Sequence, residues 1–234
     1  MQLFYDPDLD NSAKTFTFPA QESKHLVRVL RKREGDRVHI TNGRGDLFQV
    51  EILLADPTGC RAQIISHERS VPKRFKLHLA VAPTKMNERY EWMLEKATEI
   101  GLDEISPLRC DRSERKTIKG DRLEKVVQAA MKQSLQTRLP LLHPLRPFEE
   151  FIAGDFPGLK FIAHCGTGDK MELKRVARAD TDITLLIGPE GDFSPREIAQ
   201  AQARGFVPIS LGNNRLRTET AAILACAIIN TINT

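Results

Sequence analysis

Two short apolar runs in the last quarter of the chain constrain its fold more than any other feature. Residues 185–187 and 207–211 each run directly into a glycine, which is followed by a loop and the start of a helix. Short apolar runs that stop at glycine are typical of buried strands. Because open α/β sheets bind ligands beyond the carboxyl ends of their strands, these two glycine-bearing loops predict a binding site.

The chain from residue 76 onward alternates between strand-like and helix-like patterns, which predicts a mostly parallel α/β sheet. Apolar runs predict strands at residues 77–82, 104–108, 161–164, 183–187 and 207–211. Apolar residues at helical spacing predict helices at residues 88–100, 121–138 and 218–229. Ser194, Pro195 and Glu197 form a capping box with proline at the first helical position, which predicts one more helix. The last helix is apolar on nearly every side, which suggests burial at a subunit interface.

The first 71 residues predict a separate small domain. Alternating patterns predict short strands at residues 15–18, 37–41, 47–54 and 60–66. The Asn42-Gly43 pair predicts a tight turn, a helical pattern covers residues 21–31, and residues 70–75 have the composition of a linker. Several short strands joined by tight turns are typical of a small β-barrel. We therefore expect domains at residues 1–71 and 76–234.

Charge, cysteine and histidine usage limit the classes of function. The formal net charge is +4, which permits a polyanionic partner without requiring one. The four cysteines and six histidines show neither disulfide nor metal-ligand spacing, so we expect reduced cysteines, no metal site and a cytoplasmic protein. The N-terminus does not match a signal peptide, and the most apolar segment, residues 221–229, is too short to span a membrane.

Positive charge is concentrated in residues 24–37 and 109–119. A solvated helix face or loop explains either segment by itself. A basic helix beside a small barrel also suits RNA, because neutralisation of phosphates drives such binding. The candidate RNA-binding residues are Lys24, Arg28, Arg31, Lys32, Arg109, Arg112, Arg115 and Lys116.

The two loops near the carboxyl end combine glycines with aliphatic and charged residues. Gly188, Gly191 and Gly212 would let the backbone approach a ligand closely, although a tight turn also explains each of them alone. Neither the dinucleotide fingerprint nor the P-loop motif is present. Aliphatic side chains here would sandwich an adenine ring while backbone groups read its edge. The charged residues beside them are explained either as salt-bridged loop charges or as groups that hold a phosphate or a developing oxyanion; they are Glu190, Asp192, Arg215, Arg217 and Glu219.

These motifs resemble the bacterial 16S rRNA uridine-N3 methyltransferases of the SPOUT superfamily, the RsmE family. The specific ones are L-I-G-P-E-G-D-F-S at residues 186–194 and L-R-T-E-T-A at residues 216–221. The resemblance extends over essentially the whole chain, through the segments H-L-V-R-V-L-R-K-R-E-G-D (25–36), E-K-A-T-E-I-G (95–101), R-C-D-R-S-E-R-K (109–116) and A-A-M-K-Q-S (129–134). The chain departs from the family pattern at Asp192, Asn214 and Arg215, where a glycine, an arginine and Ile or Val are usual.

The resemblance implies a PUA-like RNA-binding barrel followed by a SPOUT α/β domain with a trefoil knot. It also implies that S-adenosylmethionine binds at the knot, that 16S rRNA of the small ribosomal subunit is the partner, and that two chains pair through the knot region and the last helix. The cofactor-binding residues implied by the motifs are His164, Leu186, Ile187, Gly188, Gly191, Leu211, Gly212, Leu216 and Thr218.

The expected reaction is direct methyl transfer to N3 of a flipped-out uracil. N3 is a poor nucleophile while protonated, so catalysis must remove its proton or stabilise the resulting anion. We expect Arg217 to stabilise charge and Glu190 or Glu219 to act as base or orienting group, whereas Trp92 is interpreted as a packing residue. Two alternatives stay open, namely methylation of a ribose 2′-hydroxyl and a non-catalytic RNA-binding role in ribosome assembly.

Overall fold

The computed structural model describes residues 2–10 and 12–234, which form two compact units. The first contains the described residues up to Pro72 together with Met131–Leu139, and the second contains Lys73–Ala130 and Pro140–Thr234. The sequence pattern places residues 131–139 in the C-terminal domain because they continue a helical pattern. In the structure, helix α3 (Gly120–Gln133) ends five residues before the predicted end at residue 138. Leu135, which lies within the predicted helix, is 42% exposed and has a φ of 59°.

The first unit is a five-stranded sheet in the order β1-β3-β4-β5-β2. Its strands are β1 (Leu3–Tyr5), β2 (Thr15–Thr17), β3 (Arg37–Thr41), β4 (Asp46–Leu54) and β5 (Arg61–Arg69). Only β1 and β3 run parallel. Most of β4 alternates between buried and half-buried residues, as expected for a sheet with one face on a core. Phe4 of β1 packs edge-to-face on Phe18 at 5.5 Å, so side chains from the two edge-strand regions meet across the core.

The helix predicted at residues 21–31 is not a continuous α-helix. Helix α1 (Ala20–Lys24) passes into the π-helix η1 (His25–Val29). The amide of Leu30 donates to the carbonyl of His25, and Leu26 is completely buried in the core. A π-helical turn holds more residues than an α-helical turn, so the basic side chains leave the helix at different angles from those predicted. Arg31 follows it with a φ of 55°.

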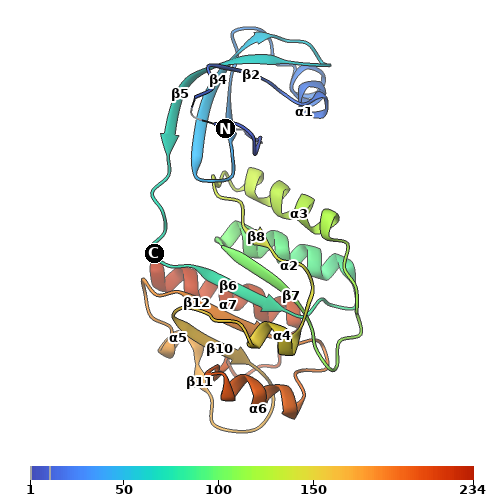
Figure 1. The fold of residues 1–234 in the computed structure, drawn as a ribbon, viewed down its shortest axis with the longest axis vertical. Coiled ribbons are helices and arrows are strands. Elements are labelled where there is room, and N and C mark those ends of the chain that lie inside the picture. Colours follow the sequence, from blue (N-terminus) through green and yellow to red (C-terminus); the bar gives the residue numbers. More distant parts are fainter. Residues whose placement is uncertain (1, 11) are drawn as a thin grey trace. The chain divides into compact units, whose positions relative to one another are not determined.

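The second unit contains an all-parallel sheet in the order β11-β13-β10-β12-β6-β7-β8, and β9 also pairs with β7 (Figure 1). The strands are β6 (Leu77–Val81), β7 (Glu104–Arg109), β8 (Leu141–Leu142), β9 (Arg146–Pro147), β10 (Leu159–Ala163), β11 (Met171–Glu172), β12 (Ile183–Ile187) and β13 (Val207–Ser210). Every residue of β12 is buried, which explains its unbroken apolar sequence.

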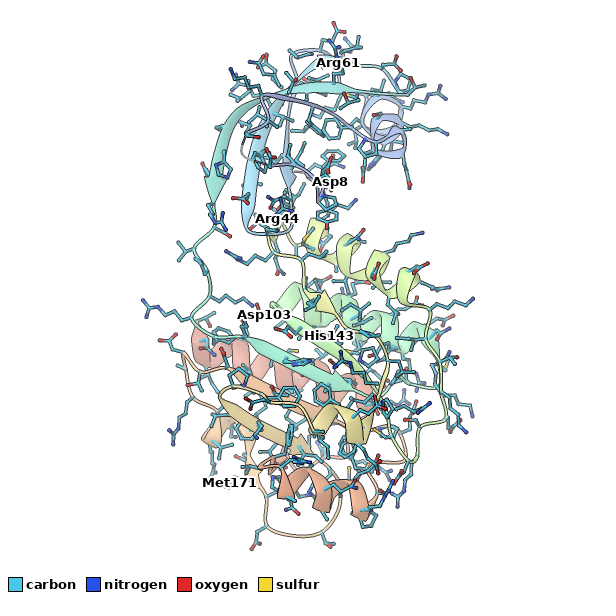
Figure 2. The ribbon with its side chains drawn as sticks, viewed as in Figure 1. Asp8, Arg44, Arg61, Asp103, His143 and Met171 are labelled. Atoms are coloured by element: carbon cyan, nitrogen blue, oxygen red, sulfur yellow. The ribbon has the colours of Figure 1, made fainter. Side chains whose placement is uncertain are left out.

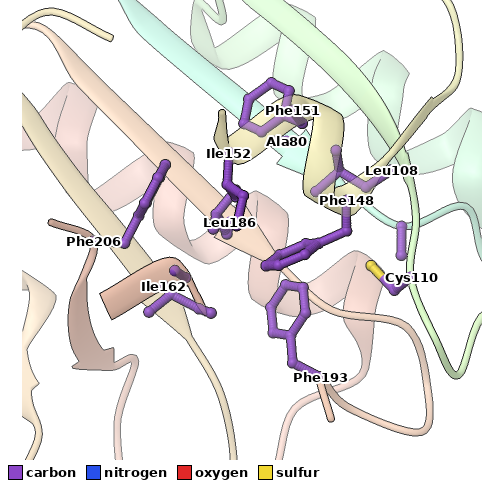
Figure 3. Close-up of a cluster of buried hydrophobic side chains, with 12 residues drawn as sticks. Ala80, Leu108, Cys110, Phe148, Phe151, Ile152, Ile162, Leu186, Phe193 and Phe206 are labelled. Atoms are coloured by element: carbon purple, nitrogen blue, oxygen red, sulfur yellow. The ribbon is translucent and has the colours of Figure 1, made fainter. Parts of the chain in front are cut away.

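Helices cover both faces of this sheet. Helix α7 (Thr218–Asn233) packs on β6, β12 and α2 (Asn87–Ile100), while α4 (Phe148–Ile152) and α6 (Pro195–Ala203) lie on the other face (Figure 1). A short helix, α5 (Leu173–Val176), contacts α7. The core under α4 and α6 contains Leu186 of β12, Phe148 of α4 and Phe193, among other residues (Figure 3). The predicted capping box is present, since the amide of Glu197 donates to Ser194 Oγ and the Glu197 carboxylate accepts from the amide of Ser194.

The strand order determines where the loops meet. Because β10 lies between β13 and β12 and all three are parallel, their carboxyl ends share one edge of the sheet. Three loops therefore converge there, one more than the two predicted from the glycine-ended apolar runs. The trefoil knot implied by the resemblance stays a prediction. Within the described residues, no helix combines the length and apolarity needed to cross a membrane.

Candidate active site

The three converging loops surround a cavity of about 970 Å³ in the second unit. It is lined by residues 163–166 and Lys170 after β10, residues 187–192 after β12, and residues 209–218 at and beyond the end of β13, with Arg112 and Ala221. Of the nine predicted cofactor-binding residues, eight line it. Leu186 does not, because it is 0% exposed and belongs to the core under α4 and α6. Successive strand residues point to opposite faces, so the neighbouring Ile187 reaches the cavity instead.

Gly188 is placed where a larger residue would not fit. A Cβ there would lie 3.1 Å from the ring and from the amide nitrogen of Phe193, which is buried. The Gly188 carbonyl accepts a buried hydrogen bond of 3.0 Å from the hydroxyl of Thr218, the first residue of α7. The loop after β12 and the beginning of α7 are thus held together, and this fixes one wall of the cavity.

The loop after β10 is organised by a lysine. Lys170 Nζ donates to the carbonyls of His164 and Gly166 at 2.8 and 2.7 Å. Both ring nitrogens of His164 are buried and have no hydrogen-bond partner among the described residues. Burial and the nearby Lys170 lower the pKa of His164, so its ring is neutral at pH 7.

The loop after β13 offers open backbone. Gly212 has a φ of 132°, a conformation that residues with a side chain rarely adopt, and its Cβ position is free of atoms within 4 Å. Ser210 Oγ accepts from the amide of Gly212 and donates to its carbonyl. This turn leads through Leu216 and Arg217 to the beginning of α7.

The three candidate catalytic residues have different surroundings. Arg217 is exposed and borders both the large cavity and a smaller one. Glu190 lines the large cavity, but one of its carboxylate oxygens accepts a 2.8 Å hydrogen bond from the amide of Lys85. The Glu219 side chain is 7% exposed, and its Oε1 lies 3.8 Å from Nε of Arg89. Its Oε2 is buried without a hydrogen-bond partner in the described chain.

The smaller cavity, of about 530 Å³, lies next to the large one and shares Arg215, Leu216 and Arg217 with it. Its other lining residues are Glu88, Arg89 and Trp92 of α2, and Glu219 and Thr220 of α7. The interpretation of Trp92 as a packing residue is incorrect, because its side chain is 48% exposed. Sequence reasoning missed Arg89 because its partner, Glu219, is 130 residues away in the chain.

Known proteins match this chain over nearly its whole length. A model of an RNA methyltransferase domain matches residues 71–230, and one of an RNA methyltransferase PUA domain matches residues 18–65. A ribosomal RNA small subunit methyltransferase E from Mesomycoplasma hyopneumoniae is 31% identical over 71% of this chain and 75% of its own length. The chain belongs to the ribosomal RNA small subunit methyltransferase E family.

Two solved structures resemble this family member closely. A probable rRNA-methyltransferase from Porphyromonas gingivalis aligns with a TM-score of 0.92 and 41% identity, covering 100% of this chain and 98% of its own. A Legionella pneumophila protein solved in complex with the bound cofactor SAM aligns with a TM-score of 0.88 and 28% identity, covering 99% and 97% of the two chains.

Asp192, where the family pattern usually has a glycine, joins two of the cavity loops. Its φ of 65° is left-handed, which a glycine adopts without strain. Its Oδ2 accepts from the amide of Cys165 at 2.9 Å, and its Oδ1 accepts from the amide of Phe193 at 2.8 Å. The carboxylate therefore connects the loop after β10 with the loop after β12, which a glycine could not do.

Two of the predicted RNA-binding arginines hold loops of the site. Arg112 donates to the carbonyl of Gly191 at 2.9 Å, and Arg115 donates to the carbonyls of Thr84 and Lys85. Their charge is still partly accessible, but their guanidinium groups position the loops after β6 and β12. The other predicted RNA-binding residues are exposed or, for Lys32, half-buried: Lys24, Arg28, Arg31, Lys32, Arg109 and Lys116.

The structure brings together three side chains that the sequence did not connect. Atoms of His78, Glu104 and His143 that could bind a metal lie within 4.8 Å of one another (His143 is labelled in Figure 2). His143 Nε2 lies 3.1 Å from the Glu104 carboxylate, and His78 Nε2 lies 2.8 Å from Ser106 Oγ. The Nε2 atom of each histidine is already engaged in one of these contacts. We therefore interpret the group as a polar network at the amino-terminal ends of β6 and β7.

Proposed function

We propose that this chain transfers a methyl group from S-adenosylmethionine to N3 of a uridine in 16S rRNA of the small ribosomal subunit. The observation that carries the proposal is the cavity at the carboxyl ends of β10, β12 and β13, which Arg217 lines, together with the smaller cavity beside it, which Arg217 and Glu219 line. The name of the Mesomycoplasma relative and the SAM-bound Legionella structure support the same activity.

The residues of the cavity fit the cofactor. Its volume of about 970 Å³ is ample for a ligand the size of S-adenosylmethionine. Open backbone at Gly212 and aliphatic side chains suit the edge and faces of adenine, and the unpartnered ring nitrogens of His164 can accept or donate a hydrogen bond. The residues that would hold the cofactor are His164, Ile187, Gly188, Gly191, Leu211, Gly212, Leu216 and Thr218.

S-adenosylmethionine supplies an electrophilic methyl group when bound, and the chain must provide an unprotonated N3 next to it. Glu219 is better placed than Glu190 to take the N3 proton, because one carboxylate oxygen of Glu190 already accepts a hydrogen bond from the amide of Lys85. Removing the proton leaves negative charge on the uracil oxygens. Arg217, which borders both cavities, would stabilise that charge as an oxyanion donor does.

The basic residues of the first unit would contact the phosphates of the RNA. Lys24 of α1, Arg28 of η1 and Arg31, which follows η1, are all exposed. Each phosphate neutralised releases counterions, so binding through these residues should weaken as salt increases. Arg109 and Lys116 would add to the same effect from the second unit.

Two further properties belong to this proposal. We infer a homodimer that pairs through the knot region and α7, because several apolar residues of α7, such as Ile223, Leu224 and Ile228, are only half-buried in the single chain. We infer a cytoplasmic location, because the substrate is ribosomal RNA.

Nucleoside analysis of 16S rRNA from cells that lack the gene tests this function. We expect 3-methyluridine to be absent and to return when the wild-type chain is expressed. The variant Gly188→Ala should fail to restore it, because the added Cβ meets Phe193, whereas Gly120→Ala should restore it because that position is open. If a ribose-methylated nucleoside were lost instead, the methyl acceptor would be a ribose 2′-hydroxyl and not N3. An unchanged nucleoside profile would indicate a non-catalytic role in ribosome assembly.

A further inference from the structure

We propose that the smaller cavity, bordered by α2 and the beginning of α7, is the uracil-binding pocket. In it, Trp92 stacks on the base, and Arg89, Glu219 and Arg217 read its edge. The inference rests on the proposed function, and it adds the residues that select the base.

Trp92 has the properties of a stacking platform. It is the only tryptophan in the chain, and nearly half of its side chain is exposed on α2 although it borders a concave surface. Arg89 lies three residues earlier, on the same face of the helix. Exposed aromatic rings inside positively charged grooves are the usual way in which proteins hold single unstacked bases.

The charged residues match the edge of uracil. That edge presents an acceptor at O4, a donor at N3–H and an acceptor at O2. The cavity is lined by three guanidinium groups, those of Arg89, Arg215 and Arg217, which only donate, and by the carboxylates of Glu88 and Glu219, which only accept when ionised. A donor–acceptor–donor set is therefore available for an acceptor–donor–acceptor edge.

Glu219 itself indicates that a donor is missing. Its side chain is 93% buried, and Oε2 has no hydrogen-bond partner among the described residues, while Oε1 lies 3.8 Å from Arg89 Nε. A buried carboxylate oxygen without a donor is unfavourable, and the N3–H group of uracil would supply one. In the same contact the carboxylate can take the N3 proton: the N–H bond breaks, an O–H bond forms, and the electron pair stays on N3.

Cytosine would be rejected by the same groups. It presents an amino donor at position 4 and an unprotonated acceptor at N3, so the carboxylate would meet an acceptor and one guanidinium would meet a donor. Sites built to bond one polar pattern discriminate strongly against the other, because their buried groups are left unpaired. The smaller cavity lies next to the cofactor cavity and shares the segment Arg215–Arg217 with it. This position agrees with a role in presenting the base to the cofactor.

Because Trp92 is the only tryptophan, its fluorescence reports on this cavity alone. We would titrate the full-length protein with uridine 5′-monophosphate and cytidine 5′-monophosphate while following Trp92 emission, and confirm the affinities by calorimetry. Wild type should show saturable quenching and at least ~10-fold tighter binding of the uridine nucleotide, the scale of one good base contact.

Three variants separate the parts of the pocket. Glu219→Gln should bring the two affinities within about threefold, because a side-chain amide can donate to cytosine N3. Trp92→Ala, followed by calorimetry, should weaken uridine binding by roughly tenfold or more, the range measured for stacked bases. Glu95→Gln is the matched control, since it makes the same change on α2 outside the cavity and should leave the preference for uridine unchanged.

Two results would overturn the inference. One is the absence of saturable, uridine-selective quenching in the wild type. The other is a Trp92 emission that changes with protein dilution and not with nucleotide, which would assign this surface to a second copy of the chain. Methyl transfer to rRNA without uridine-selective binding would reject the pocket while the proposed function stands. Uridine-selective binding without methyl transfer would support the pocket and reject the proposed function.

Discussion

Replacing Asp192 by glycine should loosen the cofactor site without unfolding the domain. The change removes the hydrogen bonds from the amides of Cys165 and Phe193, the first of which connects two cavity loops. It also relieves the left-handed backbone at φ 65°, which disfavours residues with a side chain by about 1 kcal/mol. A glycine gains a similar amount of chain entropy on unfolding, about 0.5–1 kcal/mol, so global stability should change by less than ~1 kcal/mol.

The effect on the cofactor follows from the bond between the loops. A hydrogen bond to a charged acceptor contributes about 1.5–3 kcal/mol when it is buried. Asp192 is half-buried and its bond to Cys165 is exposed, so we take about 1 kcal/mol, which corresponds to roughly a fivefold weaker affinity. Asp192→Asn, which tolerates the same backbone and keeps one acceptor oxygen, should fall between wild type and glycine.

Calorimetric titration with S-adenosylmethionine measures this directly, with urea unfolding alongside. Asp180→Gly is the matched control, because Asp180 also has a left-handed φ of 54° but does not line the cavity. The reasoning is refuted if Asp192→Gly binds the cofactor as tightly as wild type. It is equally refuted if Asp180→Gly weakens binding by the same factor.

Three other changes test the mechanism, the polar network and the RNA contacts. Arg217→Ala should lower single-turnover methyl transfer by roughly a hundredfold or more while cofactor affinity stays within about tenfold, and unchanged transfer would remove Arg217 from the mechanism. Burial lowers the pKa of His78, which faces Glu104, His143 and Arg146, to about 4 from 6.5, so the free energy of unfolding should fall as pH decreases from 6.5 toward 4. In the wild type this fall in the free energy of unfolding should be about 3 kcal/mol, measured by urea unfolding across the pH range. In His78→Gln the fall should be much smaller, and a fall as large as in the wild type would contradict the prediction. Replacing both Lys24 and Arg28 by alanine should weaken RNA binding and reduce the salt slope by about 1.4–1.8, whereas a loss independent of salt would argue against phosphate contacts.

Elements with strong local signals were predictable from the sequence. The capping box at Ser194 and Glu197 is made by residues close together in the chain, and it is present. The apolar run of β12 was predicted with its observed bounds because the strand is buried on both faces. Because every residue of the strand is apolar and buried, its sequence shows no alternation. The sequence therefore could not show that Leu186 faces the core and Ile187 the cavity.

Features that depend on distant contacts were not predictable. The sequence shows Arg112 and Arg115 as free positive charges, whereas the carbonyls that engage them lie 79 and about 30 residues away. The π-helix at His25–Val29 has the same composition as an ordinary amphipathic helix. Leu135 fitted the apolar spacing of α3, but the helix had already ended.

Several parts of the site arise only from the order of strands. That β10 lies between β12 and β13, and so adds the loop of His164 to the cavity, depends on the strand order and not on local sequence. The meeting of Arg89 with Glu219, and of His78 with Glu104 and His143, depends on it in the same way. The site is formed by contacts between residues that are distant in the chain. Residue patterns could therefore predict where the site lies but not all of the residues that form it.

The most direct test of the central claim is methyl transfer by the purified chain. Small ribosomal subunits isolated from cells that lack the gene would be incubated with S-adenosylmethionine labelled in its methyl group, and their 16S rRNA would be digested to nucleosides. We predict that the label appears in 3-methyluridine. Label in any other nucleoside, or no label while the cofactor binds, would contradict the proposed reaction.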